Sequence, residues 1–222
     1  MLSVIVVSKN RHSILRRCLK SIVDNSTNID LWVGYDEGDE ETNEIGLEFG
    51  ARTTSSRESG NRHKYLLNPI VNTCDGDYVI SINDDVEVMT NNFDKVIDEV
   101  MYNSFKFNKV GYGICNERWS IGNAKSDWEA ALGHQYACYP ILTKPLINAL
   151  GYFMPPQISG PGADITLSSI IFGADNPSFC NIPVSLFDHA HVSEKNQSRH
   201  YNRYTNTDLK KDIEKINAHT NS

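Results

Sequence analysis

Short, continuous runs of apolar residues alternate with helical patterns over the first hundred residues. The runs at 3–7, 29–35 and 77–82 are rich in β-branched residues, as is typical of strands buried on both faces of a parallel sheet. The order predicts a single α/β, Rossmann-like domain with a doubly wound, mainly parallel sheet and right-handed crossovers. Apolar residues with the spacing of amphipathic helices lie between and after these runs, at 15–22, 42–49, 61–74 and 93–101.

Local signals predict where these helices begin and end. Ser13 is the expected N-cap of the first helix, and Thr90 or Asn91 that of the fourth. Gly50 follows the second helix at a position where a left-handed residue commonly ends a helix. Pro69 lies inside the third pattern and predicts a kink or a late start there.

The patterns in the second half are weaker, and we expect one domain over residues 1–195 followed by a polar, helical tail at 196–222. The polar segment 116–134 carries Trp119 and Trp128, which either stack on sugar faces from a mobile loop or anchor that loop by packing. Strands are predicted at 110–114 and 136–142, and helices from Thr143, at 164–172 and at 207–217.

Composition narrows the class of protein. With 40% hydrophobic and 22% charged residues the chain is ordinary for a soluble domain, and a net charge of −7 argues against a general nucleic-acid binder. The 5 cysteines are scattered without a CxxC pair, which favours reduced thiols in an intracellular protein over a zinc site or disulfides. Because no apolar stretch approaches ~18 residues, we expect a cytoplasmic protein without an integral membrane segment.

The strand predicted at 77–82 ends in Asn83-Asp84-Asp85. Adjacent carboxylates repel each other and cannot be buried unpaired, so folding alone does not explain them. At the carboxyl end of a strand in an α/β sheet, however, they would face the crevice where ligands bind. Carboxylate oxygens there suit Mg²⁺ or Mn²⁺, which usually share their coordination with substrate phosphates. A surface acidic turn without a ligand is the alternative.

Three motifs in order carry a resemblance to a known family. The opening Val4–Arg11, the strand Val33–Tyr35 with its acidic turn to Asp39, and the DXD-like Ile82–Val88 resemble the corresponding segments of GT-A glycosyltransferases, particularly family 2-like enzymes. The resemblance covers about the first hundred residues, and it implies a GT-A domain with a mixed, mainly parallel central sheet flanked by helices. The chain departs from the family pattern at Asn83, where Asp is usual, and at Ser8-Lys9, where a Thr-aromatic pair is common.

The resemblance assigns residues 1–100 to nucleotide-sugar binding. It implies that Asp85 coordinates Mn²⁺ or Mg²⁺ bridging the nucleotide diphosphate, and that Asn83 or Asp84 contacts the ribose or the water shell of the metal. Asp36 would accept a hydrogen bond from the base of a uracil-type nucleotide, unless it is only a solvated turn carboxylate. The first turn would hold base and ribose through Ser8, Asn10 and Arg11.

Two arginines are further candidates in this half. Arg57 and Arg62 flank a Gly-Asn pair at a predicted helix start, where a helix N-terminus itself favours anions. They would add positive charge near the diphosphate, or they are plain surface residues.

The resemblance assigns residues 101–195 to the acceptor. Asp164, after Gly160-Pro161-Gly162-Ala163, would be the general base that takes the proton of the acceptor hydroxyl, or else the N-cap of its helix. The family usually shows two consecutive acids here, and this chain has Ala163 before Asp164. His189 and His191 would complete the metal site, or they form a structural pair.

Together these features predict a metal-dependent, inverting glycosyltransferase. It would move a hexosyl or deoxyhexosyl group from a nucleotide-sugar, in the first place a UDP-sugar, to a hydroxyl of a glycan or another acceptor. A nucleotidyltransferase with a similar sheet is the enzymatic alternative, although the turn at 8–11 lacks the glycine that such an enzyme would use. A catalytically silent module that binds a sugar or nucleotide is the other.

Overall fold

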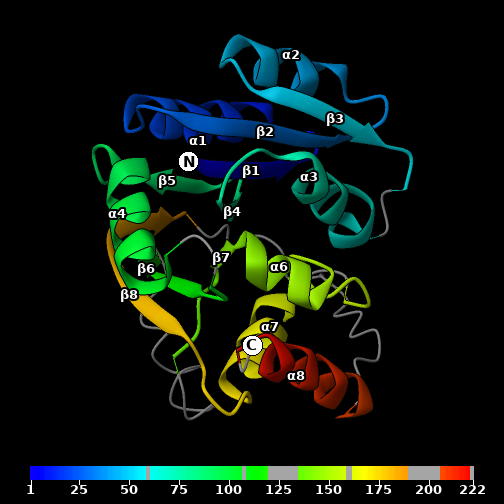
Figure 1. The fold of residues 1–222 in the computed structure, drawn as a ribbon. Helices are drawn as coiled ribbons and strands as arrows, with labels where there is room; N and C mark the ends of the chain where they lie inside the picture. Colours follow the sequence, from blue (N-terminus) through cyan, green and yellow to red (C-terminus); the bar gives the residue numbers. More distant parts are fainter. Residues whose placement is uncertain (59–60, 107–108, 120–134, 159–161, 190–205, 221–222) are drawn as a thin grey trace.

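The structure, a computed structural model, describes residues 1–58, 61–106, 109–119, 135–158, 162–189 and 206–220. Its described strands form one mixed sheet in the order β3-β2-β1-β4-β7-β6-β8-β5, with helices on both faces (Figure 1). Four strand pairs are parallel and three antiparallel, so the predicted α/β class and mainly parallel sheet are confirmed.

The N-terminal half is a parallel, doubly wound sheet. The strand β1 pairs with β2 on one side and with β4 on the other, and β2 pairs with β3. The strand β3 was not predicted, because its Arg-Thr-Thr-Ser-Ser sequence has no apolar run and lies at the edge of the sheet. The bounds are β1 Leu2–Ser8, β2 Ile29–Asp36, β3 Arg52–Ser56 and β4 Tyr78–Asn83.

The second half adds strands of mixed direction. The strand β7 lies antiparallel between β4 and β6, while β8 runs parallel to β6 and antiparallel to β5. The strand predicted at 136–142 is only β7, and the segment predicted as a loop at 116–134 begins inside β6; residues 120–134 lie outside the described part. The bounds are β5 Val86–Val88, β6 Tyr112–Trp119, β7 Ile141–Thr143 and β8 Phe179–Asp188.

The connection from β4 to β5 requires the sheet to curl. Only Asp84 and Asp85 separate the two strands, yet β5 lies four positions beyond β4 in the sheet. In a flat sheet four strand spacings cover ~19 Å, whereas a three-residue step reaches only ~11 Å. The β8-β5 edge must therefore bend back towards β4, and the two acidic residues lie where it arrives.

Two hydrophobic clusters cover the two faces of the sheet. One packs α1, α2 and α4 against residues such as Val4 and Ile80, and the other packs α3, α6, α7 and α8 against residues such as Ile5 and Val79. The alternation of Val4 and Ile5 between the clusters is the two-sided burial expected of a central strand. The helices are α1 His12–Asp24, α2 Glu40–Glu48, α3 Asn68–Thr73, α4 Phe93–Phe105, α6 Lys144–Leu150, α7 Ala163–Phe172 and α8 Asn206–Thr220.

The predicted helix ends are partly correct. Gly50 is left-handed at φ 73° as expected, and the N-terminus of α3 places Pro69 in the first turn, after a π-helical turn η1 at His63–Leu67. The N-caps at Ser13 and at Thr90 or Asn91 are wrong, since the helices begin after Arg11 and after a left-handed Asn92 without a side-chain cap.

Among the helices in the described ranges, none combines the length and hydrophobicity that a membrane crossing requires.

Candidate active site

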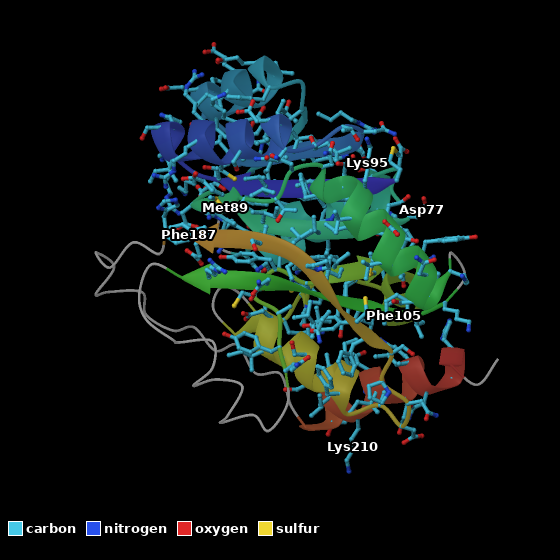
Figure 2. The ribbon with its side chains drawn as sticks, turned by 90° about the vertical axis from the view of Figure 1, so that its left-hand side faces the viewer. Asp77, Met89, Lys95, Phe105, Phe187 and Lys210 are labelled. Carbon is cyan, nitrogen blue, oxygen red and sulfur yellow. The ribbon has the colours of Figure 1, made fainter. Side chains whose placement is uncertain are left out.

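The carboxyl ends of β1, β2 and β4 place the predicted acidic residues along one edge of the sheet. Figure 2 shows this polarity: Asp77, just before β4, lies at one side of the molecule. At the other side lies Phe187 of β8, which pairs with Glu87 of β5 next to the acidic turn Asp84–Asp85. Because β1 is the neighbour of both β2 and β4, its following turn lies between Asp36 and the Asp84–Asp85 pair.

Arg11 lies across the two carboxylates of the acidic turn. Its Nη1 donates to Asp84 Oδ1 at 2.6 Å and its Nη2 to Asp85 Oδ2 at 2.9 Å. Asp84 is buried, with a side chain only 4% exposed, and that of Asp85 is 14% exposed. Charge-assisted bonds of this kind offset the repulsion between two adjacent acids. The guanidinium is therefore the counter-charge of the pair.

Ser8 adds a third hydrogen bond to this arrangement, since its Oγ donates to Asp84 Oδ2 at 2.6 Å. Burial raises the pKa of Asp84, although the bonds from Ser8 and Arg11 act in the opposite direction. The remaining oxygen, Asp85 Oδ1, is buried and accepts no hydrogen bond from the described residues. A buried acceptor without a donor is costly, so this atom is suited to a ligand.

The acidic turn can supply only part of the ligands that a divalent metal needs. No group of three or more His, Cys, Asp and Glu side chains placed to hold a metal ion occurs in the described part of the chain. Mg²⁺ is commonly held by one or two carboxylates, with substrate phosphates and water completing its shell. Asp85, through its unpartnered Oδ1, fits that kind of site, in which most ligands come from outside the protein.

Asp36, at the end of β2, offers a second free acceptor oxygen. It is buried, and the Lys9 Nζ lies 2.5 Å from its Oδ2, while its Oδ1 accepts no hydrogen bond from the described residues. The ammonium balances the charge and leaves acceptor capacity for an N–H group of a ligand.

Asp39 organises the turn that contains Ser8, Asn10 and Arg11. Its Oδ2 accepts from the backbone N–H of Asn10 at 2.7 Å, where Asn10 is left-handed at φ 51°. It also bonds His12 Nε2 and caps α2 through Thr42. Burial alone would raise the pKa of Asp39, but these bonds lower it to about 2. This role of Asp39 was not predicted, although an aspartate directly before a helix is a capping signal.

The structure separates the two candidate arginines. The side chain of Arg57 is 86% exposed, and its Nε pairs with Glu37 Oε2 at 2.6 Å, away from the Asp84–Asp85 pair. Arg62, immediately before η1, is partly buried, and its charge acts to lower the pKa of Asp84. Of these two arginines, Arg62 is therefore the one placed to act on Asp84.

Asn83 is exposed, and its side chain bonds to the buried pair Tyr139–Asp188, which was not predicted. Its Nδ2 donates to Tyr139 Oη at 3.4 Å, and that hydroxyl donates to Asp188 Oδ2 at 2.5 Å. Burial raises the pKa of Tyr139 well above its usual value, so the hydroxyl stays a donor. Only the tertiary structure brings these three residues together, and the one sequence signal was the position of Asp188 beside His189.

His189 lies beside the acidic turn through its backbone, and its ring pairs with Glu87. Its Nε2 is 2.6 Å from Glu87 Oε1, an oxygen that also pairs with Arg17 Nε at 3.0 Å. Its role as a metal ligand stays a prediction, and His191 lies outside the described residues.

Asp164 is the second residue of α7, so it lies in the first turn and is not the N-cap, which is Gly162. Burial raises the pKa of Asp164 to about 6; the backbone N–H groups of the turn oppose this, and the charge of Glu117 adds to it. Glu117 in turn accepts the backbone N–H groups of Cys138 and Tyr139, each at 3.1 Å. Glu117 therefore bonds to the backbone of Tyr139, and its charge also acts on Asp164. Trp119 ends β6, and Trp128 lies outside the described residues.

Comparison with known proteins identifies the family of this chain. The sequence model of the family described as Glycosyl transferase family 2 matches residues 3–144, which include Asp36 and the acidic turn. No protein with a curated function matches the chain.

Solved structures share the fold at low identity. TarS 1-349 of S. aureus in complex with UDP-GlcNAc superposes with a TM-score of 0.68 at 11% identity, covering 98% of this chain and 66% of that one. The mannosyltransferase PcManGT from Pyrobaculum calidifontis, in complex with GDP-Man and Mn²⁺, gives 0.66 at 13% identity, covering 86% of this chain and 57% of that one. The chain thus spans about 57–66% of the length of these proteins.

Proposed function

Because the chain belongs to glycosyl transferase family 2, we propose that it transfers a sugar from a nucleotide-sugar donor to an acceptor hydroxyl. The observation that carries the proposal is a pair of buried carboxylate oxygens without a hydrogen-bond partner among the described residues, Asp36 Oδ1 at the end of β2 and Asp85 Oδ1 after β4, on the two sides of β1. One offers a hydrogen-bond acceptor for a nucleobase, and the other offers an oxygen for the cation of a diphosphate. The turn of Ser8 to Arg11 lies between them.

The donor is a UDP-sugar in this proposal. Asp36 retains acceptor capacity in a buried position, and a uracil ring presents a single N–H that one carboxylate satisfies. TarS has been solved with UDP-GlcNAc, which supports this choice, while PcManGT was solved with GDP-Man. Ser8 and Asn10 line the turn in which the ribose would lie, and the hexosyl or deoxyhexosyl nature of the sugar is part of the same proposal.

Mn²⁺ or Mg²⁺ would be held by Asp85, with Arg62 adding positive charge at the same edge. When bound, the metal supplies charge neutralisation for the departing diphosphate. The Mn²⁺ in the complex of PcManGT supports a divalent ion. His189 and His191 remain candidates for a further ligand.

Asp164 is the proposed general base, and its single carboxylate implies inversion at the anomeric carbon. With a pKa of about 6 it is mostly ionised at neutral pH, yet it is a stronger base than an ordinary aspartate. Desolvation of the carboxylate is what raises its pKa and makes it the stronger base.

Release of nucleoside diphosphate tests the function. The full chain is incubated with a panel of UDP-sugars and GDP-sugars and Mn²⁺, with and without hydroxyl acceptors. We expect UDP release that falls by about 10²-fold or more in Asp85→Asn. Asp24→Asn is the matched control, because Asp24 is exposed and pairs only with Lys20 on α1 among the contacts described. Donor binding without release by the wild type would instead indicate a silent binding module.

A further inference from the structure

The acidic pair already has a cation of its own. Arg11 and Ser8 occupy three of the four carboxylate oxygens of Asp84 and Asp85, at 2.6 to 2.9 Å. The Arg11 side chain is 32% exposed, against 4% for Asp84 and 14% for Asp85, so the guanidinium is the most accessible group of the three.

A divalent metal therefore meets two obstacles when it approaches alone. It finds one free oxygen, Asp85 Oδ1, and any second carboxylate oxygen on Asp85 or Asp84 Oδ1 must first lose its bond to Arg11. The guanidinium also repels the metal, and at ~4 Å that repulsion is appreciable even with the screening of water. Both obstacles lower the affinity for a bare metal ion.

A nucleotide diphosphate removes both obstacles at once. Its oxygens supply the ligands that the protein lacks, and its negative charge offers the displaced guanidinium a bidentate partner as good as the carboxylates. Arg62, whose charge reaches Asp84, is placed to assist the same anion.

We propose that Arg11 is a resident counter-cation that competes with the divalent metal for Asp84 and Asp85, so that the metal binds tightly only together with the nucleotide diphosphate. This inference rests on the proposed function, because it takes the acidic turn as the donor site. By linkage, the factor by which UDP strengthens metal binding equals the factor by which the metal strengthens UDP binding. Arg11 sets the size of that factor.

Titration of the metal-free full chain with Mn²⁺ alone tests the competition. Free Mn²⁺ is measured by its paramagnetic resonance signal, without any donor. We expect Arg11→Gln to bind Mn²⁺ on the order of tenfold more tightly than the wild type, because two oxygens are freed and one positive charge is removed. Addition of UDP should then strengthen Mn²⁺ binding less in Arg11→Gln than in the wild type.

Arg16→Gln is the matched control. Arg16 lies on α1, five residues after Arg11, carries the same charge and pairs with the exposed Glu48. Arg16→Gln removes the same charge as Arg11→Gln but leaves the contacts of Asp84 and Asp85 unchanged. If Arg11→Gln binds Mn²⁺ no more tightly than Arg16→Gln, or shows no binding at all, the competition is overturned.

Arg11→Lys covers the case in which Arg11→Gln does not fold, which thermal melting would reveal. Lysine keeps a positive charge beside the buried acids but makes one point contact instead of a fork. We expect it to bind Mn²⁺ more tightly than the wild type and than Arg16→Lys, by a smaller factor, and equality with Arg16→Lys would overturn the proposal. Because no sugar donor is used, this outcome is separate from the test of sugar transfer.

Discussion

The backbone N–H of His189 donates to the carbonyl oxygen of Asp85 at 3.1 Å. This bond continues the antiparallel pairing of β5 with β8 beyond Asp188, which faces Val86 in the register. The end of β8 is thereby attached to the acidic turn through the backbone, while the Asp188 side chain is held by Tyr139. The position of the acidic turn depends on this attachment, so a substitution of Tyr139 should also displace the turn.

We predict that Tyr139→Phe destabilises the fold by about 1–2 kcal/mol, because a buried carboxylate loses a hydrogen-bond donor. It should also weaken donor binding, since Asn83 loses its contact with the hydroxyl. Urea unfolding and UDP titration measure the two effects. Tyr102→Phe is the control, with an exposed side chain and an expected change within ~0.5 kcal/mol. Equal effects of the two changes would contradict the structural role of Tyr139.

Asp36→Ala should lower UDP affinity by about tenfold or more, because the base loses a charged hydrogen-bond acceptor in a buried position. Calorimetric titration with UDP measures this directly. Glu37→Gln is the neighbouring control, since the exposed Glu37 pairs outwards with Arg57. Unchanged UDP affinity in Asp36→Ala would exclude this carboxylate from base recognition.

Removing the carboxylate of Asp164 should lower activity and, above pH 6, raise stability. Its pKa is raised from 3.8 to about 6, so the folded state favours the protonated form, and stability is lost as the pH rises from about 3.8 through about 6. Asp164→Asn should therefore be more stable at pH 8, on the order of 1–2 kcal/mol, in thermal or urea unfolding.

The same change should reduce sugar transfer by ~10²–10⁴-fold, as expected for removal of a general base. In the wild type, kcat/KM should rise with pH through about 6, where Asp164 becomes ionised. The rise should be absent in the residual activity of Asp164→Asn. A variant that keeps both its rate and the pH profile would show that another group accepts the proton.

The contribution of Asp39 to stability should depend on pH in the direction opposite to that of Asp164. Its pKa is lowered from 3.8 to about 2, so its contribution is fully present above about pH 3.8 and is lost as the pH falls towards 2. Asp39→Asn should cost roughly 1–2 kcal/mol at pH 7 and less at pH 2.5. Urea unfolding at the two pH values measures the difference, and a pH-independent cost would mean that the charge of Asp39 is not what holds the turn.

Periodicity in the sequence predicted those elements that bury apolar faces. The strands β1, β2 and β4 are continuous apolar runs, and each of α1 and α4 shows a clear buried stripe. In contrast, β3 is polar and β5 has only three residues, so neither leaves a periodic signal. Their positions are decided by pairing with other strands, which a local pattern does not contain.

The sequence predicted several residues of the candidate site, but it did not predict which of them contact one another. The acidic turn and Asp36 were recognisable because charged residues at the ends of buried strands are unusual. The role of Arg11 as the partner of Asp84 and Asp85 was not, since it depends on β1 and β4 being neighbours in the sheet. For the same reason Tyr139, which is separated from Asp188 by 49 positions, could not be linked to it beforehand.

The two-residue step from β4 to β5 has a consequence for how this site can vary. Asp84 and Asp85 are the whole length of chain available to close the curl of the sheet, so an inserted or deleted residue here would shift β5 against β8 as well as displace a carboxylate. The identity of these two residues can change by substitution, as at the neighbouring Asn83, but their number cannot change without opening the sheet. The spacing of the acidic residues is therefore constrained by architecture even where the chemistry would tolerate another arrangement.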